Sequence, residues 1–530
     1  MQYTVRQRIN MVMAVFFVIA IAFSSFTTIS AHDILWHLKS GQWIVEHARV
    51  PLYDVFSYTA SQTLWIDHTW LFQIMMYAIY LLFNFMGLIL FKIAVVLVMY
   101  GSILLFLHKK NALRFDLLLL SYLIVQERIQ VRPEILSFLF IILFLIVLEN
   151  YQTQCQRTYW LYTLPLMQCI WSNMEGLFML GPALILFYLF DRHPNRLKLF
   201  VVFILTILCC FITPYHWHSI VFAFQLLMEM ISYLFLSKAP VGELLSTFSS
   251  NTPWRMMHSL YLLLLLICSI VFWKHRKTFK KSHQLTLAAF FILSVLAQRN
   301  IALLALSSPL LLSAYTENHD KEKSVLFFIR TFLVLTALTL LIYCSYTSLL
   351  YSKNGEYKRW GKGIAPEIYP EQAITDLLSK YDHGHIFNDM DFGPALIFMG
   401  SPQIKVFIDP RTQIYRGDIQ NLYQNIFYQD KILHKTIDDF NIRYIMLSSY
   451  NKASLNLISS LSKDPNWHLT YTDGYATLFI KAPIPETLSW SKIIHMPNGP
   501  TEKSLHTYQY LSRVMIALEH YTEAKNILLK

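Results

Sequence analysis

The chain has 530 residues, of which 55% are hydrophobic and only 15% are charged, and its mean hydropathy is +0.40. This composition excludes an ordinary soluble protein and is typical of a polytopic membrane protein. The formal net charge of +11 does not indicate a nucleic-acid partner, because the lysines and arginines fall in short clusters between apolar runs, as the positive-inside rule expects of cytoplasmic loops.

Residues 9–31 form the first apolar stretch, and they are long enough to cross a bilayer behind Arg6 and Arg8. We expect a membrane span whose N-terminal end is cytoplasmic. A secretory signal peptide cleaved after residues 29–31 is the alternative. The length of the stretch favours the span.

The segment after this span carries most of the candidate chemistry. Its acidic and histidine side chains are interleaved with tryptophan and tyrosine: His32, Asp33, His37, Glu46, His47, Asp54, Asp67 and His68. Residues 69–84 then form an apolar stretch interrupted by polar side chains, which favours a helix that lies in the membrane interface or re-enters the membrane. Residues 86–107 are expected to cross back to the cytoplasm.

The apolar pattern continues along the chain. Further spans are expected near residues 113–126, 134–149, 160–172, 177–190, 197–213, 256–273, 285–297, 300–315 and 325–350. Alternation then places every basic cluster on the cytoplasmic side, which supports about eleven spans and an outer location for residues 351–530. Residues 221–237 are apolar enough for another span, but the surrounding charges favour an interfacial or re-entrant helix.

The composition changes to that of a soluble domain after residue 351. A helical stretch at 371–380 is followed by strand patterns and by a hairpin turning at Asp473-Gly474; the strand patterns cover residues 385–388, 404–409, 442–447, 467–471 and 475–481. This alternation predicts a small α/β domain. The last residues are expected to be helical, and residues 521–525 resemble the second helix of a tetratricopeptide repeat.

The expected fold is therefore an α-helical polytopic membrane protein with a C-terminal extracytoplasmic α/β domain. The predicted boundaries are 1–350 for the membrane domain, within which 32–85 form the first outer loop, 351–485 for the α/β domain, and 486–530 for a helical tail that could be a partial tetratricopeptide pair.

Several motifs carry a family resemblance. In the first outer loop they are His32-Asp33-x-x-Trp36-His37-Leu38-x-x-Gly41-x-Trp43, Pro51-x-x-Asp54-x-Phe56-Ser57-Tyr58 and Trp65-x-Asp67-His68-x-Trp70; further along they are Arg132-Pro133, Trp171-x-Asn173-x-x-Gly176, Arg299-Asn300 and Lys405-Val406-Phe407-Ile408-Asp409-x-Arg411 with Tyr415. The chain resembles bacterial multi-span glycosyltransferases of the C-type (GT-C) superfamily, of the glycosyltransferase 39-like, polyprenyl-phosphate-sugar-dependent kind.

The resemblance implies an inverting transferase of the bacterial inner membrane. It would move a sugar from a polyprenyl-phosphate donor to an envelope glycan, lipid or protein on the extracytoplasmic side. Such an enzyme needs a base for the acceptor hydroxyl and a cation for the departing phosphate. In GT-C enzymes an acid of the first outer loop is the base, and Asp33 occupies that place.

We therefore predict Asp33 as the catalytic base, with Glu175 or Asp67 as a helper. Many relatives carry Asn-x-His-Gly where this chain has Asn173-Met174-Glu175-Gly176, so no histidine role carries over to that turn. The residues predicted to bind the lipid phosphate or the sugar are Arg132, Arg299, His32, His68 and Trp36. Guanidinium groups suit phosphate oxygens because their fork of donors matches the geometry.

No metal ligand or cofactor is assigned. A divalent metal held by His32, His37 and Asp33 is left open, because their spacing meets metal geometry only in some backbone conformations. Membrane lipid and the polyprenyl-linked sugar are the expected partners, and nucleic acid is not.

Each candidate also has a purely structural reading. Asp33 and Asp67 can be ordinary residues at helix ends. Asp54, which precedes Phe-Ser-Tyr, suits an Asx turn, and Asp409 with Arg411 suits a stabilising ion pair. The tryptophans suit an interface belt, and the arginines can reach lipid headgroups.

Two other functions stay open on the sequence alone. One is a non-catalytic relative that serves as a scaffold in envelope assembly. The other is a transporter or flippase of lipid-linked glycans, although we find no inverted repeat of spans.

Overall fold

The computed structural model describes residues 5–153, 158–236, 242–315, 324–352, 358–365, 368–415, 417–481, 493–494 and 502–520. The chain forms two compact units. One contains Met1–Ser30 and His68–Gly363, and the other contains Ala31–Asp67 and Ile364–Lys530. We call them the membrane unit and the distal unit.

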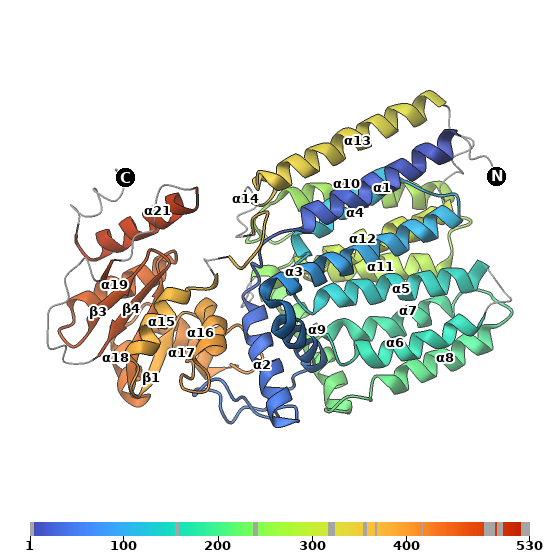
Figure 1. Cartoon of the computed structure of the whole chain (residues 1–530). Coiled ribbons are helices and arrows are strands. Elements are labelled where there is room, and N and C mark those ends of the chain that lie inside the picture. The colour runs from blue at the N-terminus through green and yellow to red at the C-terminus, as the bar shows by residue number, and fades with distance from the viewer. Residues whose placement is uncertain are drawn as a thin grey trace. The chain divides into compact units, whose positions relative to one another are not determined.

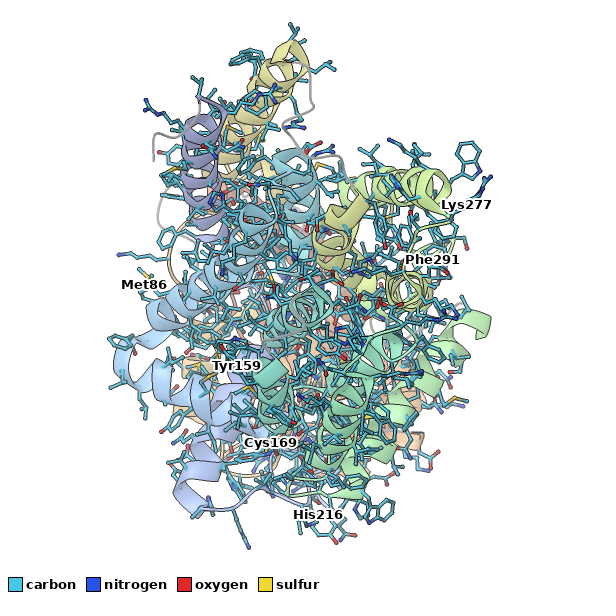
Figure 2. All side chains as sticks on the ribbon, turned by 90° about the vertical axis from the view of Figure 1, so that its right-hand side faces the viewer. Met86, Tyr159, Cys169, His216, Lys277 and Phe291 are labelled. Carbon is cyan, nitrogen blue, oxygen red and sulfur yellow. The ribbon has the colours of Figure 1, made fainter. Side chains whose placement is uncertain are left out.

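The membrane unit is built from helices (Figure 1). They are α1 (Val5–Ser25), α3 (Trp70–Lys109), α4 (Phe115–Val125), α5 (Glu134–Thr153), α6 (Thr163–Trp171), α7 (Leu180–Tyr188), α8 (Arg196–Cys209), α9 (Trp217–Leu236), α10 (Met256–His275), α11 (Lys281–Leu296), α12 (Ile301–Leu312), α13 (Ser324–Tyr346) and α14 (Leu349–Ser352). Figure 2 shows the mainly apolar side chains that pack between them, and α12 is buried along its whole length.

Six of the described helices are long and apolar enough to cross a membrane: Val5–Ser25, Trp70–Lys109, Glu134–Thr153, Trp217–Leu234, Met256–His275 and Val325–Tyr346. The chain is thus a helical membrane protein. Other apolar stretches form shorter helices, such as α7 with nine residues and α12 with twelve. The count of about eleven spans stays a prediction.

The first helix ends earlier than the sequence pattern indicates. It stops at Ser25, and the backbone of Thr27 instead pairs with Trp360 in an isolated bridge. The amide of Ile29 donates to the carbonyl of Gly363 at 2.9 Å. These irregular contacts replace the last turns of the expected span over residues 9–31.

Helix α3 contains a break at Asn84, whose φ of 52° and ψ of −155° are not helical. The break lies where the sequence pattern changes between residues 69–84 and 86–107. Asparagine adopts positive φ more readily than most residues, so it suits this position. Residues 221–236 form part of the continuous helix α9, and their interfacial assignment stays a prediction.

The distal unit contains a four-stranded sheet in the order β1-β2-β4-β3. Strand β1 (His385–Asn388) runs parallel to β2 (Ile442–Ser448), and β4 (Ala476–Ile480) runs antiparallel to β2 and to β3 (His468–Thr472). The hairpin between β3 and β4 turns through Gly474, whose φ is 87°. This confirms the expected small sheet and its hairpin.

Seven helices belong to the described part of the distal unit: α2 (Asp33–His47), α15 (Glu371–Lys380), α16 (Gly393–Gly400), α17 (Asp418–Ile426), α18 (Asp430–Asp439), α19 (Lys452–Lys463) and α21 (Glu502–Ala517). Helix α2 packs against α16. The tetratricopeptide-like motif at residues 521–525 lies outside the described residues.

One predicted strand is wrong. Residues 404–409 are buried except for Lys405, but they do not join the sheet. Val406 instead donates its amide to the carbonyl of Phe56 at 3.1 Å and accepts from the amide of Tyr58 at 3.3 Å. Phe56 and Tyr58 therefore satisfy the backbone groups of Val406 that a neighbouring strand would otherwise satisfy.

Candidate functional site

The candidate residues fall into two groups, one in each unit. The first group surrounds the turn between α6 and the short helix η3 (Gly176–Met179). Glu175 caps η3, because its Oε2 accepts hydrogen bonds from the amide of Leu177 at 2.7 Å and from the hydroxyl of Ser137 at 2.6 Å. Its Oε1 makes no hydrogen bond within the described ranges. One oxygen of Glu175 is thus available to a ligand.

The start of α3 packs on the same turn. The indole N–H of Trp70 donates to Oδ1 of Asn173 at 2.8 Å, and the amide of Leu71 donates to its carbonyl at 3.2 Å. A methyl group placed on Gly176 would lie 3.5 Å from Nε2 of His68. Two motifs that are far apart in the sequence are therefore neighbours, and His68 lies beside Gly176.

Arg128, Arg132 and Arg299 are among the arginines that lie in the short connections at helix ends in this unit. Arg128 forms ion pairs with Glu134 at 2.5 Å and with Glu243 at 2.7 Å. Arg132 binds the same oxygen of Glu243 at 2.8 Å. Burial raises the pKa of Glu243, but the nearby arginines outweigh burial and hold this pKa well below its ordinary value. Glu243 is thus an anion shared between two cations.

Arg299 differs from these two arginines. It lies in the short helix η5 (Gln298–Asn300), is half-buried, and interacts electrostatically with both Glu175 and Glu243. Within the described part of the chain its guanidinium makes no ion pair and no hydrogen bond. The donors of Arg299 are therefore not used by any described residue, and its charge acts on Glu175.

The second group lies in the distal unit, where Asp33 is the first residue of α2. A carboxylate in the first turn of a helix is favourable because it opposes the positive end of the helix dipole. Asp33 and His32 are half-buried, whereas Trp36 and His37 are buried with ring centroids 3.7 Å apart. The structure thus places Asp33 at the start of a separate helix after the first span.

Arg411 contacts helix α2 and the rest of the segment 31–67. This side chain is 1% exposed and forms a bidentate pair with Asp409, at 2.8 and 2.7 Å, and a third contact with Asp54 at 2.8 Å. Tyr415 donates to Asp409 at 2.5 Å. Burial alone lowers the pKa of Arg411, but the two carboxylates raise it well above its ordinary value.

Three aromatic rings enclose the same guanidinium. Its carbon lies 4.5 Å from the ring centroid of Trp65, 5.3 Å from that of Phe56 and 5.7 Å from that of Trp36. Only 7% of Trp36 is exposed, so most of its ring is occupied by this packing. Cation–π contacts of this kind add to the ion pairs because the site is dry.

The geometry of Asp54 agrees with an Asx turn. Its carboxylate accepts from the amides of Phe56 at 3.3 Å and Ser57 at 2.7 Å. The Asp409–Arg411 pair is likewise a buried structural pair. The ion pair between Asp54 and Arg411 was not predicted from the sequence. Both residues lie in motifs that carry the family resemblance, but nothing in either motif indicates that the two side chains pair.

The described His, Cys, Asp and Glu side chains include no group of three or more arranged to hold a metal ion. His32, His37 and Asp33 therefore do not form such a group. The candidates divide as follows: His32, Asp33, Trp36 and Asp67 belong to the distal unit, and His68, Arg132, Glu175 and Arg299 belong to the membrane unit. The peptide bond between Asp67 and His68 joins the two groups.

No protein-family model matches the chain, and no curated protein sequence matches it. Among solved structures it is similar to the archaeal oligosaccharyltransferase AglB from Archaeoglobus fulgidus in complex with an inhibitory peptide and a dolichol-phosphate, with a TM-score of 0.55 and 11% identity over 87% of this chain and 71% of that chain. The apo form of the A. fulgidus enzyme gives 0.52 and 11% over 86% and 71%. At this identity the likeness shows the fold alone, which this chain shares with the A. fulgidus enzyme.

Proposed function

We propose that this chain is a membrane glycosyltransferase that moves a sugar from a polyprenyl-phosphate donor to a glycan, lipid or protein of the cell envelope. The GT-C fold supports the class of reaction. The dolichol-phosphate in the AglB complex is a polyprenyl-type phosphate, and it supports this class of donor. In this proposal the enzyme lies in the bacterial inner membrane and the distal unit is extracytoplasmic.

The observation that carries the proposal is the environment of Arg299. The transfer breaks the bond between the anomeric carbon and the phosphate oxygen, and negative charge then develops on the leaving phosphate. A guanidinium whose donors are not already used can stabilise that charge. Arg132 is the second ligand in the proposal, and it must share its charge with Glu243.

Asp33 is proposed as the base that takes the proton from the acceptor hydroxyl. The acceptor oxygen then attacks the anomeric carbon as the phosphate departs, and this single displacement inverts the configuration. Glu175 is the preferred helper, because its Oε1 makes no hydrogen bond among the described contacts. His68, which would contact the sugar, lies beside the adjacent Gly176. Asp67 is the second choice for helper. His32 flanks the base, and Trp36 fixes the first turns of α2.

The test follows transfer in membranes that contain the full chain and a radiolabelled lipid-linked sugar. We expect Asp33→Asn to lower the transfer rate by about 10²- to 10⁴-fold, which is the range for loss of a general base. Glu46→Gln is the matched control, because Glu46 lies on the same helix, is exposed and bonds only to Gln42 among the contacts described.

The outcomes separate the assignments. Undiminished transfer by correctly inserted Asp33→Asn would remove Asp33 as the base while leaving the transferase in place. No transfer by the wild-type chain with any donor would instead favour a non-catalytic scaffold, which the structural capping role of Glu175 would also suit.

A further inference from the structure

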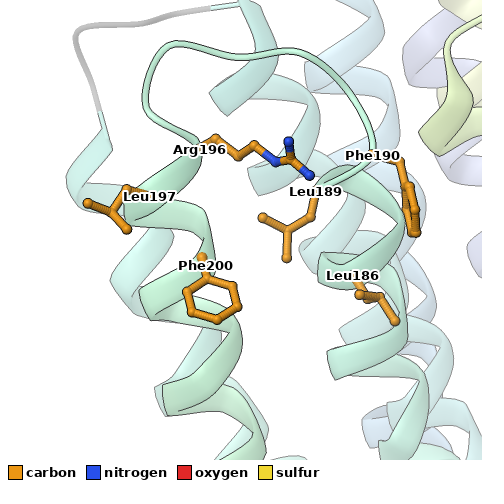
Figure 3. A pocket seen from close by; sticks show the side chains of 6 residues that line it. All are labelled: Leu186, Leu189, Phe190, Arg196, Leu197 and Phe200. Carbon is orange, nitrogen blue, oxygen red and sulfur yellow. The ribbon is translucent and has the colours of Figure 1, made fainter.

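A groove lies between α7 and α8 at the turn that joins them (Figure 3). Its volume is about 460 Å³, which is within the usual range for small-molecule sites. The residues that line it are Leu186, Leu189, Phe190, Arg196, Leu197 and Phe200. Five of these six side chains are apolar, so the groove suits a hydrocarbon chain.

Several walls of the groove are open to the surroundings of the helices. Leu197 is 76% exposed, Phe190 is 53% exposed and Phe200 is 48% exposed. Apolar side chains on the outside of a membrane-embedded helix face lipid rather than water. With α7 and α8 in the membrane, as the sequence predicts for residues 177–190 and 197–213, the molecules in contact with this groove are those of the bilayer.

Arg196 gives the groove a charged end. Figure 3 shows its side chain reaching from the start of α8 toward Leu189. Its guanidinium makes no ion pair or hydrogen bond with any described residue. Arg192 and Lys198, in or next to the same turn, are also exposed and positive. The acid of the turn, Asp191, is already bonded to Ser282.

We propose that this groove binds one anionic phospholipid of the surrounding bilayer. An acyl chain lies along Leu189, Leu197 and Phe200, and the phosphate accepts hydrogen bonds from the guanidinium of Arg196. Guanidinium is well suited to this task, because two of its parallel N–H donors match two phosphate oxygens.

The position in the fold favours a bilayer phospholipid over the carrier lipid. Helix α7 begins just after the Glu175 turn and ends at the groove, so the two sites lie at opposite ends of this segment. Residues 176–188 span about 20 Å if helical throughout. A carrier whose phosphate reacts beside Glu175 would not place that phosphate at Arg196.

The experiment uses the full chain purified in detergent and measures its thermal unfolding and its bound lipid by native mass spectrometry. The lipids are phosphatidylglycerol, phosphatidylcholine and a polyprenyl phosphate, each titrated separately. For the wild type we expect phosphatidylglycerol to raise the unfolding temperature most. Arg196→Gln should weaken phosphatidylglycerol binding by about 10- to 100-fold, the usual cost of a lost charge-assisted hydrogen bond.

Arg192→Gln is the matched control, because it removes the same charge from the same exposed turn without changing the lining of the groove. It should keep most of the affinity. Equal loss in both variants would mean that net charge alone attracts the lipid, and no loss in Arg196→Gln would mean that the groove is not the site. Arg196-dependent binding of the polyprenyl phosphate alone would show that the occupant is the carrier. Each of these three results overturns the proposal, which does not depend on the transferase activity.

Discussion

At the scale of single residues, the three arginines near Glu243 show why identical side chains can have different roles. Arg128 and Arg132 have their charges neutralised by Glu134 and Glu243, whereas Arg299 makes no ion pair among the described residues. A phosphate that binds Arg132 must compete with a carboxylate. A phosphate that binds Arg299 need not, so Arg299 is expected to contribute more to donor binding.

This difference gives a prediction for the donor. Arg299→Gln should lower kcat/KM for the lipid-linked sugar by about 10- to 100-fold, because a charge-assisted bidentate contact is lost. Arg299→Lys should keep kcat/KM between the wild-type and Arg299→Gln values, because an ammonium group keeps the positive charge but lacks the two parallel N–H donors of a guanidinium. Steady-state kinetics in detergent micelles would measure both. If Arg132→Gln lowered kcat/KM by this amount and Arg299→Gln did not lower it, Arg132 would be the main phosphate ligand in place of Arg299.

A second prediction at this scale concerns Asp389, which follows β1 and is buried. Its carboxylate accepts from the amide of Ser448 at 2.5 Å and from the hydroxyl of Ser454 at 2.9 Å, and burial raises its pKa from 3.8 to about 6. The carboxyl group of Asp389 therefore binds its proton more tightly in the folded chain than in the unfolded chain. Its contribution to the free energy of unfolding is complete below pH 3.8 and is lost as the pH rises through about 6.

The free energy of unfolding falls by roughly 3 kcal/mol as Asp389 ionises, because each unit of pKa difference corresponds to about 1.4 kcal/mol. Asp389→Asn should remove this part of the pH dependence, because the amide stays neutral and still accepts the bond from Ser448. Urea unfolding of the distal unit within the full chain, followed between pH 4 and 7.5, measures the difference between the two proteins. Parallel pH profiles would show that Asp389 is already ionised across that range.

At the scale of elements, Arg411 connects α2 to the α/β part of the distal unit. Removing one member of a buried ion pair leaves the other charges unpaired, which typically costs about 3–5 kcal/mol. Arg411→Met should therefore loosen residues 31–67 and increase hydrogen exchange in α2. Arg443→Gln is the control, because Arg443 lies in the same unit and its ion pair with Asp382 is partly exposed. Unchanged protection of α2 in Arg411→Met would show that apolar packing alone holds it.

Elements with a strong local pattern could be predicted from the sequence. The hairpin at Asp473-Gly474 is specified by turn residues, and the small sheet by alternating strand patterns. Residues 404–409 have the composition of a buried strand, and all of them except Lys405 are buried. What local pattern could not provide was the partner, because Val406 pairs with Phe56 and Tyr58, far earlier in the chain.

The candidate site shows the same limit. The sequence and the family resemblance proposed the individual candidate residues, and the Asx turn at Asp54 followed from local chemistry. The ion pair between Asp54 and Arg411 and the contact of Trp70 with Asn173 depend on long-range packing, which one sequence does not encode in any local pattern. The burial of Trp36 against Arg411 also depends on long-range packing.

At the scale of the whole molecule, the membrane topology is constrained because the distal unit is assembled from two separated segments of the chain. Residues 31–67 and residues from 364 onward fold as one unit, so both must lie on the same side of the membrane. The chain between them must then cross an even number of times. Five of the described helices that are long enough to span lie in that part, so shorter helices complete a crossing or one long helix does not cross.

The topology itself can be tested. A periplasmic reporter fused after Lys530 should be active, and single cysteines introduced at Glu46 and at Lys277 should react with an impermeant thiol reagent only at Glu46. We expect this because the basic segment 274–281 belongs on the cytoplasmic side. A cytoplasmic signal from the reporter would place the distal unit on the wrong side for the proposed reaction.

The division of the distal unit into two separated segments also has a consequence for biosynthesis. Trp65 and Phe56 pack on Arg411, yet more than 300 residues must be translated after them before that arginine exists. At about 5–20 residues per second this delay is on the order of tens of seconds. During that time the loop would stay outside the membrane with its aromatic side chains uncovered, so the nascent chain should be most vulnerable to proteases and most dependent on chaperones at that stage.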